Sequence, residues 1–316
     1  MEASAGWPPG RWTQEHLAEG EMHCHRIDAT LHRADTGLQT IEVVETGGYG
    51  RGLFLDGRVQ HVAADEYIYS EAIVHPPAVM LGSRCRRVLT VGGGPGGVVR
   101  EALRHRRVER VVQVEIDAAV LELCRTWFAH VAQGCHDDPR VEVVIADIRD
   151  YARHTHERFD LVVNDISEPM EGTPAAGLFE APMLEALASL LTPEGVLVTW
   201  AGSAGPRSDD LARAIDRAVA ALLPHTTRWL CHPQAYGTAW LTVAGSRAPL
   251  DPWRLSPAAI DAWLAAEVDG EPMLYDGETH RHMFSLPKDV RRRLALADEA
   301  GPAVLRVARA AGEAAR

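Results

Sequence analysis

The feature that most constrains the fold is a glycine cluster in the first third of the chain, which reads Gly92-Gly93-Gly94-Pro95-Gly96-Gly97. Gly92, Gly94 and Gly97 satisfy the pattern G-x-G-x-x-G, between a predicted buried strand at 87–91 and a predicted helix at 98–106. Such a loop turns tightly and lets a nucleotide approach the free N–H groups at the helix N-terminus. In this context the cluster predicts a nucleotide-binding turn, although the motif alone also fits a simple glycine turn.

The segments after the loop alternate between strand and helix patterns. Strands are predicted at 111–117, 141–147, 159–165 and 195–202, with helices at 119–131 and 183–191. This alternation favours a parallel, doubly wound sheet with right-handed crossovers, a Rossmann-like α/β fold of the class I methyltransferase type. Further strands are predicted at 226–233 and 238–246, and the chain after about residue 250 is mainly helical.

The part before the loop has a different pattern. Short β runs lie on either side of Asp56-Gly57, a pair that predicts a tight hairpin because both residues tolerate positive φ. Residues 66–81 predict a helix that ends near Pro76. We expect a flexible N-terminus at 1–20, a small antiparallel β domain at 21–65, a catalytic domain at 66–250 and a helical extension at 251–316.

Charge and composition exclude several classes of function. The 32 Lys and Arg residues against 44 Asp and Glu residues leave a net charge of -12, which disfavours nucleic acid as a partner. No apolar stretch approaches the ~18 residues of a membrane span, and the N-terminus lacks a signal-peptide pattern, so we expect a cytoplasmic protein without a membrane partner. Five widely spread cysteines without a C-x-x-C pair indicate neither a disulfide framework nor a zinc site.

Two pairs of histidines and one serine loop are alternative candidate sites. His23 with His25, and His280 with His282, have the spacing of neighbours on one strand face. Two histidines are too few for a structural metal, so we expect solvent-facing strand residues and no metal. The serine in 201–205, AGSAG, lacks the first glycine of a nucleophile elbow and predicts a strand-end loop.

Acidic residues end three successive predicted strands. Glu115 follows Gly97 by 18 residues, and Asp147 and Asp165 close the next two strands. Each alone also fits a helix N-cap, but together they gather at the carboxyl edge, where open α/β sheets bind ligands. A rim of carboxylates repels a diphosphate and attracts a positive sulfur. The sequence therefore favours a sulfonium nucleoside such as S-adenosylmethionine over NAD.

Several segments in fixed order resemble the spermidine synthase superfamily of aminopropyltransferases. They are GRGLFLDGRVQHVAADEYIYSEAIVHP, RVLTVGGGPGGVVREALRH, VVQVEID, DDPRVEVVIAD and NDISEPMEGTPAAGLF. TWAGSAG and LYDGETHRHMFSLPKDVRRRLA resemble the thermospermine synthase branch, and the likeness spans roughly residues 40 to 296. The resemblance implies an N-terminal β domain, a Rossmann-like core, a homodimer, and transfer of an aminopropyl group from decarboxylated S-adenosylmethionine to an amine.

The resemblance also implies roles for individual residues. Asp165 matches the acid that orients and deprotonates the nucleophile. The residues implied to bind the donor are Gln60, Gly92, Gly94, Pro95, Glu115 and Ile116, the adenine-binding pair Asp147 and Ile148, and Pro174 and Ala175, which pack on the adenine. The residues expected on the acceptor side are Tyr69, Ser70, Glu168, Trp200 and Tyr236. Trp240 and Asp276 fit either the acceptor side or turn and core positions.

Four positions depart from the family pattern. Pro95 stands where the resembled family carries an acid that faces the transferred ammonium, so we expect the site to admit intact S-adenosylmethionine. Ser70 replaces His or Gln, Glu168 replaces Asp, and Trp200 replaces Gln. An aromatic wall suits a flatter or less charged acceptor than a polyamine, although Trp200 equally fits core packing.

The sequence thus predicts an alkyltransferase that moves a 3-amino-3-carboxypropyl or an aminopropyl group from S-adenosylmethionine or its decarboxylated form to a small-molecule nucleophile. Methylthioadenosine would be released, and the sequence favours the intact donor. The alternatives are a polyamine aminopropyltransferase, an S-adenosylmethionine-dependent methyltransferase and a non-catalytic nucleoside-binding protein.

Overall fold

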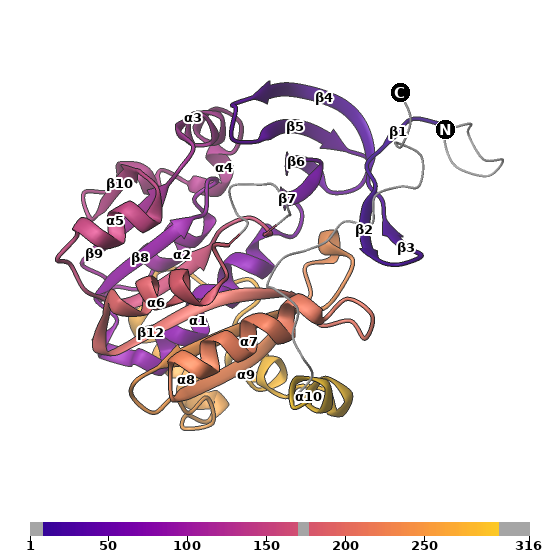
Figure 1. Ribbon diagram of the computed structural model, residues 1–316. Helices are drawn as coiled ribbons and strands as arrows, with labels where there is room; N and C mark the ends of the chain where they lie inside the picture. Colours follow the sequence, from indigo (N-terminus) through magenta and orange to yellow (C-terminus); the bar gives the residue numbers. More distant parts are fainter. Residues whose placement is uncertain (1–8, 170–176, 297–316) are drawn as a thin grey trace.

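Short strands build the first part of the chain into an antiparallel sheet at one end of the molecule (Figure 1). The computed structural model describes residues 9–169 and 177–296. The sheet order is β1-β4-β5-β6-β7, with β1 (Arg11–Trp12), β4 (Arg26–Asp35), β5 (Thr40–Thr46), β6 (Gly50–Leu55) and β7 (Arg58–Val62); β2 (Glu15–Ala18) and β3 (Glu21–His23) form a separate hairpin.

The N-terminal strands correct one expectation and confirm another. β1 and β2 lie within residues 1–20, which were expected to be loose, and that prediction was wrong for this stretch. The buried carboxylate of Glu15 accepts the backbone N–H of Val59 at 3.0 Å and so ties β2 to β7. The Asp56-Gly57 hairpin is confirmed, with φ values of 49° and 80° at the two turn residues.

A seven-stranded sheet forms the centre of the molecule. Its order is β10-β9-β8-β11-β12-β14-β13, and its strands are β8 (Arg87–Gly92), β9 (Arg110–Glu115), β10 (Val141–Ile145), β11 (Phe159–Asp165), β12 (Leu191–Ser203), β13 (His225–Cys231) and β14 (Trp240–Ser246). Neighbours from β10 to β12 are parallel, and β14 runs antiparallel to both β12 and β13. The strand order reverses between β8 and β11, which opens a crevice at their carboxyl ends. The predicted Rossmann-like fold is confirmed.

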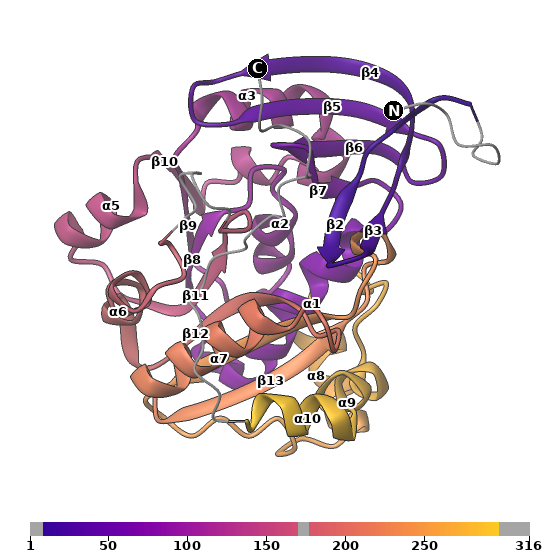
Figure 2. The ribbon, with the colours of Figure 1, turned by 45° about the vertical axis from the view of Figure 1, so that its right-hand side comes forward.

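Helices cover both faces of this sheet, and the last three lie at the end opposite the N-terminal sheet (Figures 1 and 2). They are α1 (Glu66–Leu81), α2 (Gly97–Leu103), α3 (Ala118–Trp127), α4 (Ala129–Ala132), α5 (Ile148–His154), α6 (Ala181–Ser189), α7 (Asp210–Leu222), α8 (Pro257–Glu267), α9 (Gly277–Phe284) and α10 (Lys288–Leu294). Among the described residues, no helix combines the length and apolarity that crossing a membrane requires.

Helix α1 does not end near Pro76, as the sequence predicted, but continues through Pro76 and Pro77 to Leu81. A proline lacks the N–H that would bond to the carbonyl four residues earlier, so Pro76 frees the carbonyl of Ala72. The indole N–H of Trp229 in β13 donates to that carbonyl at 2.8 Å. A tertiary hydrogen bond therefore replaces the missing helical one.

The histidine pairs also differ from expectation. His25 and His280 are buried, and His280 lies in helix α9, not in a strand. Its ring makes hydrogen-bond contacts with the Tyr275 hydroxyl at 2.6 Å and with the Pro252 carbonyl at 2.7 Å. The prediction of solvent-facing strand residues was wrong for these two, because distant parts of the chain supply their partners.

Candidate active site

The glycine cluster forms the turn between β8 and α2, at the crevice where the strand order reverses. Gly92 has φ of +79°, and a Cβ there would lie 2.4 Å from the carbonyl oxygen of Asp165. A Cβ on Gly94 would lie 2.6 Å from Val120 in α3. The N–H of Gly93 donates to the Asp165 carbonyl at 3.1 Å. The loop thus needs glycine to lie this close to β11 and α3.

Two adjoining pockets open beside this loop. The larger pocket brings together every predicted donor-binding residue that the structure describes: Gln60, Gly92, Gly94, Pro95, Glu115, Ile116, Asp147 and Ile148. The smaller pocket brings together the predicted acceptor residues Tyr69, Ser70, Glu168, Trp200 and Tyr236. Asp165 lines both pockets. Pro174 and Ala175 lie outside the described residues, and all the binding roles stay predictions.

Glu115 ends β9 and Asp147 follows β10, but their pKa values are shifted in opposite directions. Burial raises the pKa of Glu115 to about 7, and its carboxylate accepts the backbone N–H of Asp117 at 3.0 Å. Asp147 is the N-cap of α5 and accepts the N–H of Arg149 at 2.8 Å. The hydrogen-bonded Arg149 guanidinium lowers the pKa of Asp147, so this carboxylate is charged at neutral pH. Asp147 therefore both caps α5 and lines the larger pocket.

Asp165 stands at the end of β11 where the two pockets meet. The hydroxyl of Tyr69 in α1 donates to its Oδ1 at 2.6 Å. Burial raises the pKa of Asp165 to about 7, and the Tyr69 hydrogen bond opposes that rise. A carboxyl group in this range accepts a proton readily near neutral pH, as a general base requires.

Aromatic rings form one wall of the smaller pocket. Trp200 donates its indole N–H to the Ile166 carbonyl at 2.8 Å and packs against Phe179 and Trp240, with ring centroids 4.6 and 5.6 Å apart. Tyr236 lies 4.9 Å from Trp240 and donates its hydroxyl to the Gln60 carbonyl at 3.1 Å. Trp200 is therefore a core residue that also lines the pocket.

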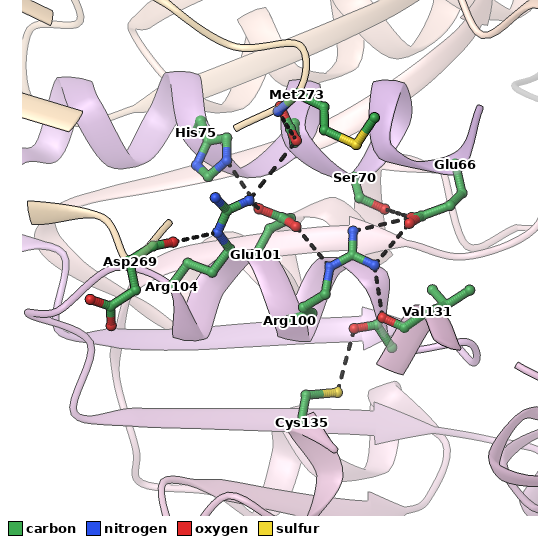
Figure 3. Close-up of polar contacts among 12 residues, drawn as sticks. Glu66, Ser70, His75, Arg100, Glu101, Arg104, Val131, Cys135, Asp269 and Met273 are labelled. Carbon is green, nitrogen blue, oxygen red and sulfur yellow. Dashed lines mark hydrogen bonds and ion pairs between the residues drawn. The ribbon is translucent and has the colours of Figure 1, made fainter. Parts of the chain in front are cut away.

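Behind Ser70, a chain of buried ion pairs connects the smaller pocket to the C-terminal part (Figure 3). Ser70 donates to Glu66 at 3.1 Å, and Arg100 holds the second oxygen of Glu66 at 2.8 Å. Arg100 also donates to Glu101 at 2.8 Å, and His75 lies 3.1 Å from Glu101. Hydrogen bonding to His75 lowers the pKa of Glu101 to about 2 despite its burial. The chain fixes α1 against α2.

The sequence analysis did not name Arg58, which lines the larger pocket. Arg58 lies two residues before Gln60 on β7 and therefore on the same face, so strand alternation gave a usable signal. Its guanidinium Nε lies 3.4 Å from Glu168 Oε1. Trp240, expected either on the acceptor side or in the core, is buried and lines the smaller pocket, whereas Asp276 is the N-cap of α9 and lines neither pocket. Within residues 9–169 and 177–296, no cluster of three His, Cys, Asp or Glu side chains is placed to hold a metal ion.

A class I Rossmann-like sheet with acids converging on a glycine loop defines an S-adenosylmethionine-type transferase. The chain belongs to the spermine/spermidine synthase family. The family's spermine/spermidine synthase domain matches residues 66–251, and the spermidine synthase tetramerisation domain matches residues 11–62. The predicted family and the predicted class of alkyl transferase are confirmed.

Similar proteins are known by sequence and by structure. The chain is 37% identical to polyamine aminopropyltransferase 2 of Hyperthermus butylicus over 90% of this chain and 93% of that protein. It is 34% identical to a polyamine aminopropyltransferase of a Synechococcus species over the same shares. A spermidine synthase in complex with the transition-state analogue AdoDATO superposes with a TM-score of 0.82 at 26% identity, over 93% of this chain and 98% of that one. The spermidine synthase of Thermotoga maritima gives a TM-score of 0.79 at 26% identity, over 94% and 98%.

Proposed function

We propose that this enzyme transfers an aminopropyl group from decarboxylated S-adenosylmethionine to a primary amine of a small molecule and releases methylthioadenosine. The observation that carries the proposal is the position of Asp165, which lines both pockets and is hydrogen-bonded to Tyr69 at 2.6 Å. A nucleoside in the larger pocket and an amine in the smaller pocket meet at this carboxylate. The named relatives support the same reaction class.

The larger pocket suits a sulfonium nucleoside. A Cβ on Gly93 would lie 3.0 Å from Asp165 Oδ2, so the loop leaves open the space that a ligand needs beside that carboxylate. Glu115 is the acid expected to accept the ribose hydroxyls. Asp147, Asp165 and Glu168 line the same pocket; Arg149 pairs with Asp147 and Arg58 with Glu168, so Asp165 is the acid left to supply negative charge for the positive sulfur.

The transfer is a displacement at carbon. The nitrogen lone pair of the acceptor forms a bond to the propyl carbon, the carbon–sulfur bond breaks, and the sulfur keeps the electron pair as a neutral thioether. Asp165 takes the proton that the nitrogen loses, and its charge stabilises the cationic donor before the transfer. Tyr69 orients the Asp165 carboxylate through its hydroxyl.

The lining of the smaller pocket favours the decarboxylated donor over the intact donor that Pro95 suggested. Asp165 and Glu168 contribute carboxylates to it, and the described residues contribute no Lys or Arg. His61 also lines it, but burial lowers the pKa of His61 to about 3, so this ring is neutral. Arg58 pairs with Glu168, so Asp165 is the carboxylate that would repel a donor still carrying its α-carboxylate.

The test is product analysis with both donors. Incubation with decarboxylated S-adenosylmethionine and an amine is expected to release methylthioadenosine, and the Asp165→Asn variant is expected to bind the donor without turnover. Faster turnover of intact S-adenosylmethionine would instead support the interpretation that Pro95 admits the intact donor. Release of S-adenosylhomocysteine would mean methyl transfer and would contradict the proposal.

We also infer an oligomer, since residues 11–62 match a tetramerisation domain. The family resemblance of the sequence implied a homodimer, and the matched domain favours a tetramer instead. Sedimentation equilibrium of the full chain distinguishes the two, and a monomer at micromolar concentration would contradict both.

A further inference from the structure

Glu15 is a buried acid that the proposed mechanism does not use. It begins β2, is 5% exposed and lines neither pocket. Its Oε1 accepts the backbone N–H of Val59, and its Oε2 lies 3.9 Å from the Nη2 of Arg58. Glu15 therefore reaches the site only through β7, the strand that also carries Gln60.

Arg58 lies between two carboxylates and is bound tightly to neither. Its Nε lies 3.4 Å from the Oε1 of Glu168, whereas another nitrogen, Nη2, faces Glu15. Both distances exceed the roughly 2.8 Å of a strong hydrogen bond between a guanidinium and a carboxylate. The second oxygen of Glu168 accepts a hydrogen bond from Gln60 at 3.0 Å, which holds this acid in place. A small movement of the guanidinium therefore exchanges Glu168 for Glu15 as its nearer partner.

These three side chains place two acids beside one cation. All three are largely buried, so water does little to stabilise the second negative charge. Burial raises the pKa of Glu15 to about 7, and the Arg58 guanidinium opposes that rise. About half of Glu15 is therefore protonated at pH 7, while Arg58 stays nearer to Glu168.

The other titratable groups around Glu15 are uncharged near neutral pH. The Nδ1 of His25 lies 3.9 Å from the Oε1 of Glu15, and burial lowers the pKa of His25 to about 4. His23 is the partner of Glu15 in the β2–β3 hairpin, and burial lowers its pKa as well. Burial raises the pKa of the Cys24 thiol. Among the described residues, Glu15 therefore responds to the charges of Arg58 and Glu168.

We propose that Glu15 is a positioning residue for the acceptor: when the second ammonium group of a diamine or polyamine binds Glu168, Arg58 moves to Glu15, which loses its proton. The proposal rests on the proposed function and adds the residue that balances Arg58 while a cationic acceptor is bound. Without this second acid, the ammonium and the guanidinium would compete for one buried carboxylate. The exchange conserves charge, because a proton leaves as the ammonium arrives.

The first test is the pH dependence of the acceptor preference. The preference is the kcat/KM for 1,4-diaminobutane or spermidine, whichever is used better, divided by the kcat/KM for 1-aminopentane. This ratio isolates the second ammonium, because Asp165 and the reacting amine enter both values. In the wild-type enzyme the ratio is expected to rise about ten-fold from pH 6 to pH 8, as the ionised fraction of Glu15 rises from about a tenth to about nine tenths. A ratio that stays constant or falls would overturn the proposal.

Two variants are expected to change this ratio in opposite directions at pH 8. Glu15→Gln keeps an oxygen for the Val59 N–H but offers Arg58 no charge, so the ratio is expected to fall about ten-fold and to lose its rise with pH. Arg58→Gln removes the cation that competes for Glu168, so the ratio is expected to increase. A purely structural role of the contact between Glu15 and Arg58 would move both variants in the same direction.

The matched control is Glu42→Gln. Glu42 is another buried acid of the N-terminal domain, pairs with Arg11 at 2.5 Å and lines neither pocket. This variant is expected to keep the wild-type ratio at every pH. Equal pH profiles of Glu15→Gln and Glu42→Gln would refute the role of Glu15.

Calorimetry separates this inference from the proposed function. Each amine is titrated into the enzyme with methylthioadenosine present, and buffers of different ionisation enthalpy give the number of protons released on binding. At pH 7 the amine with a second ammonium is expected to release about half a proton more than 1-aminopentane from the wild-type enzyme, and no more from Glu15→Gln. If no donor and amine pair yields methylthioadenosine but this difference holds, the proposed function fails and the role of Glu15 stands. If turnover occurs and the wild-type enzyme releases no additional protons, the role of Glu15 fails alone.

Discussion

Replacing Tyr69 by Phe is the sharpest test of the role of Asp165, because it removes one hydroxyl and keeps the ring. The Tyr69 hydrogen bond of 2.6 Å opposes the burial that raises the pKa of Asp165 to about 7. A hydrogen bond to a charged group contributes about 1.5 kcal/mol, and one pKa unit corresponds to about 1.4 kcal/mol. The variant is therefore expected to raise the pKa of Asp165 by about one further unit.

The kinetic consequence follows from the ionised fraction. With a pKa near 7, about half of Asp165 is ionised at pH 7, and with a pKa near 8 only about a tenth is. The kcat/KM of Tyr69→Phe is expected to fall about five-fold at pH 7 and to approach the wild-type value at pH 9. The assay is methylthioadenosine release between pH 5.5 and 9.5 at saturating donor, since protonation of the free amine affects both enzymes equally.

The matched control is Tyr236→Phe, whose hydroxyl donates to the Gln60 carbonyl and not to Asp165. The acidic limb of its pH–rate profile is expected to coincide with that of the wild-type enzyme. An acidic limb of Tyr69→Phe that does not move, or that moves to lower pH, would refute the assignment of Asp165 as the titrating base.

Three further predictions concern stability and the donor loop. Asp165→Asn is expected to raise the melting temperature at pH 8, measured by scanning calorimetry. In the wild-type protein, burial raises the pKa of Asp165 to about 7, so its ionisation destabilises the fold as the pH rises from about 4 through about 7. An unchanged or lower melting temperature would contradict this. Glu101→Gln is expected to lower the free energy of unfolding by about 3 kcal/mol in urea titration, because it leaves the buried Arg100 and the half-buried Arg104 without this acid. A loss under about 1 kcal/mol would argue against that charge balance. Pro95→Asp is expected to lower the KM for decarboxylated S-adenosylmethionine about five-fold, because it places a carboxylate beside the transferred ammonium. A higher KM would show that the loop does not face that ammonium group.

Local patterns predicted the central sheet and the positions of its acids because both depend on short stretches of sequence. The glycines at 92–97 and the acids that end or follow strands needed only the periodicity around them. The continuation of α1 through Pro76 was not predictable, since the partner of the freed carbonyl, Trp229, lies 157 residues from Ala72. Tertiary contacts of this kind have no local signal.

The same limit applies to the charges of the site. Glu168 looked from the sequence like a free acceptor-binding acid, and Arg58, 110 residues earlier, neutralises it. Trp200 combined both proposed roles, because its indole N–H is bound inside the core while the residue still lines the smaller pocket. Sequence reasoning identified the residue types at the site but not which charges remain available to a ligand.

Helix α1 also connects the reacting centre to the last part of the chain. Next to Tyr69 and Ser70, the buried carboxylate of Glu71 accepts three consecutive backbone N–H groups, from Met273, Leu274 and Tyr275, at 2.8, 2.8 and 3.0 Å. These hydrogen bonds fix the orientation of α1 about its axis, and this orientation directs the Tyr69 hydroxyl toward Asp165. The segment from 273 to 275 thus anchors the helix that carries Tyr69, and we expect that loosening it would displace the Tyr69 hydroxyl while the central sheet stays folded.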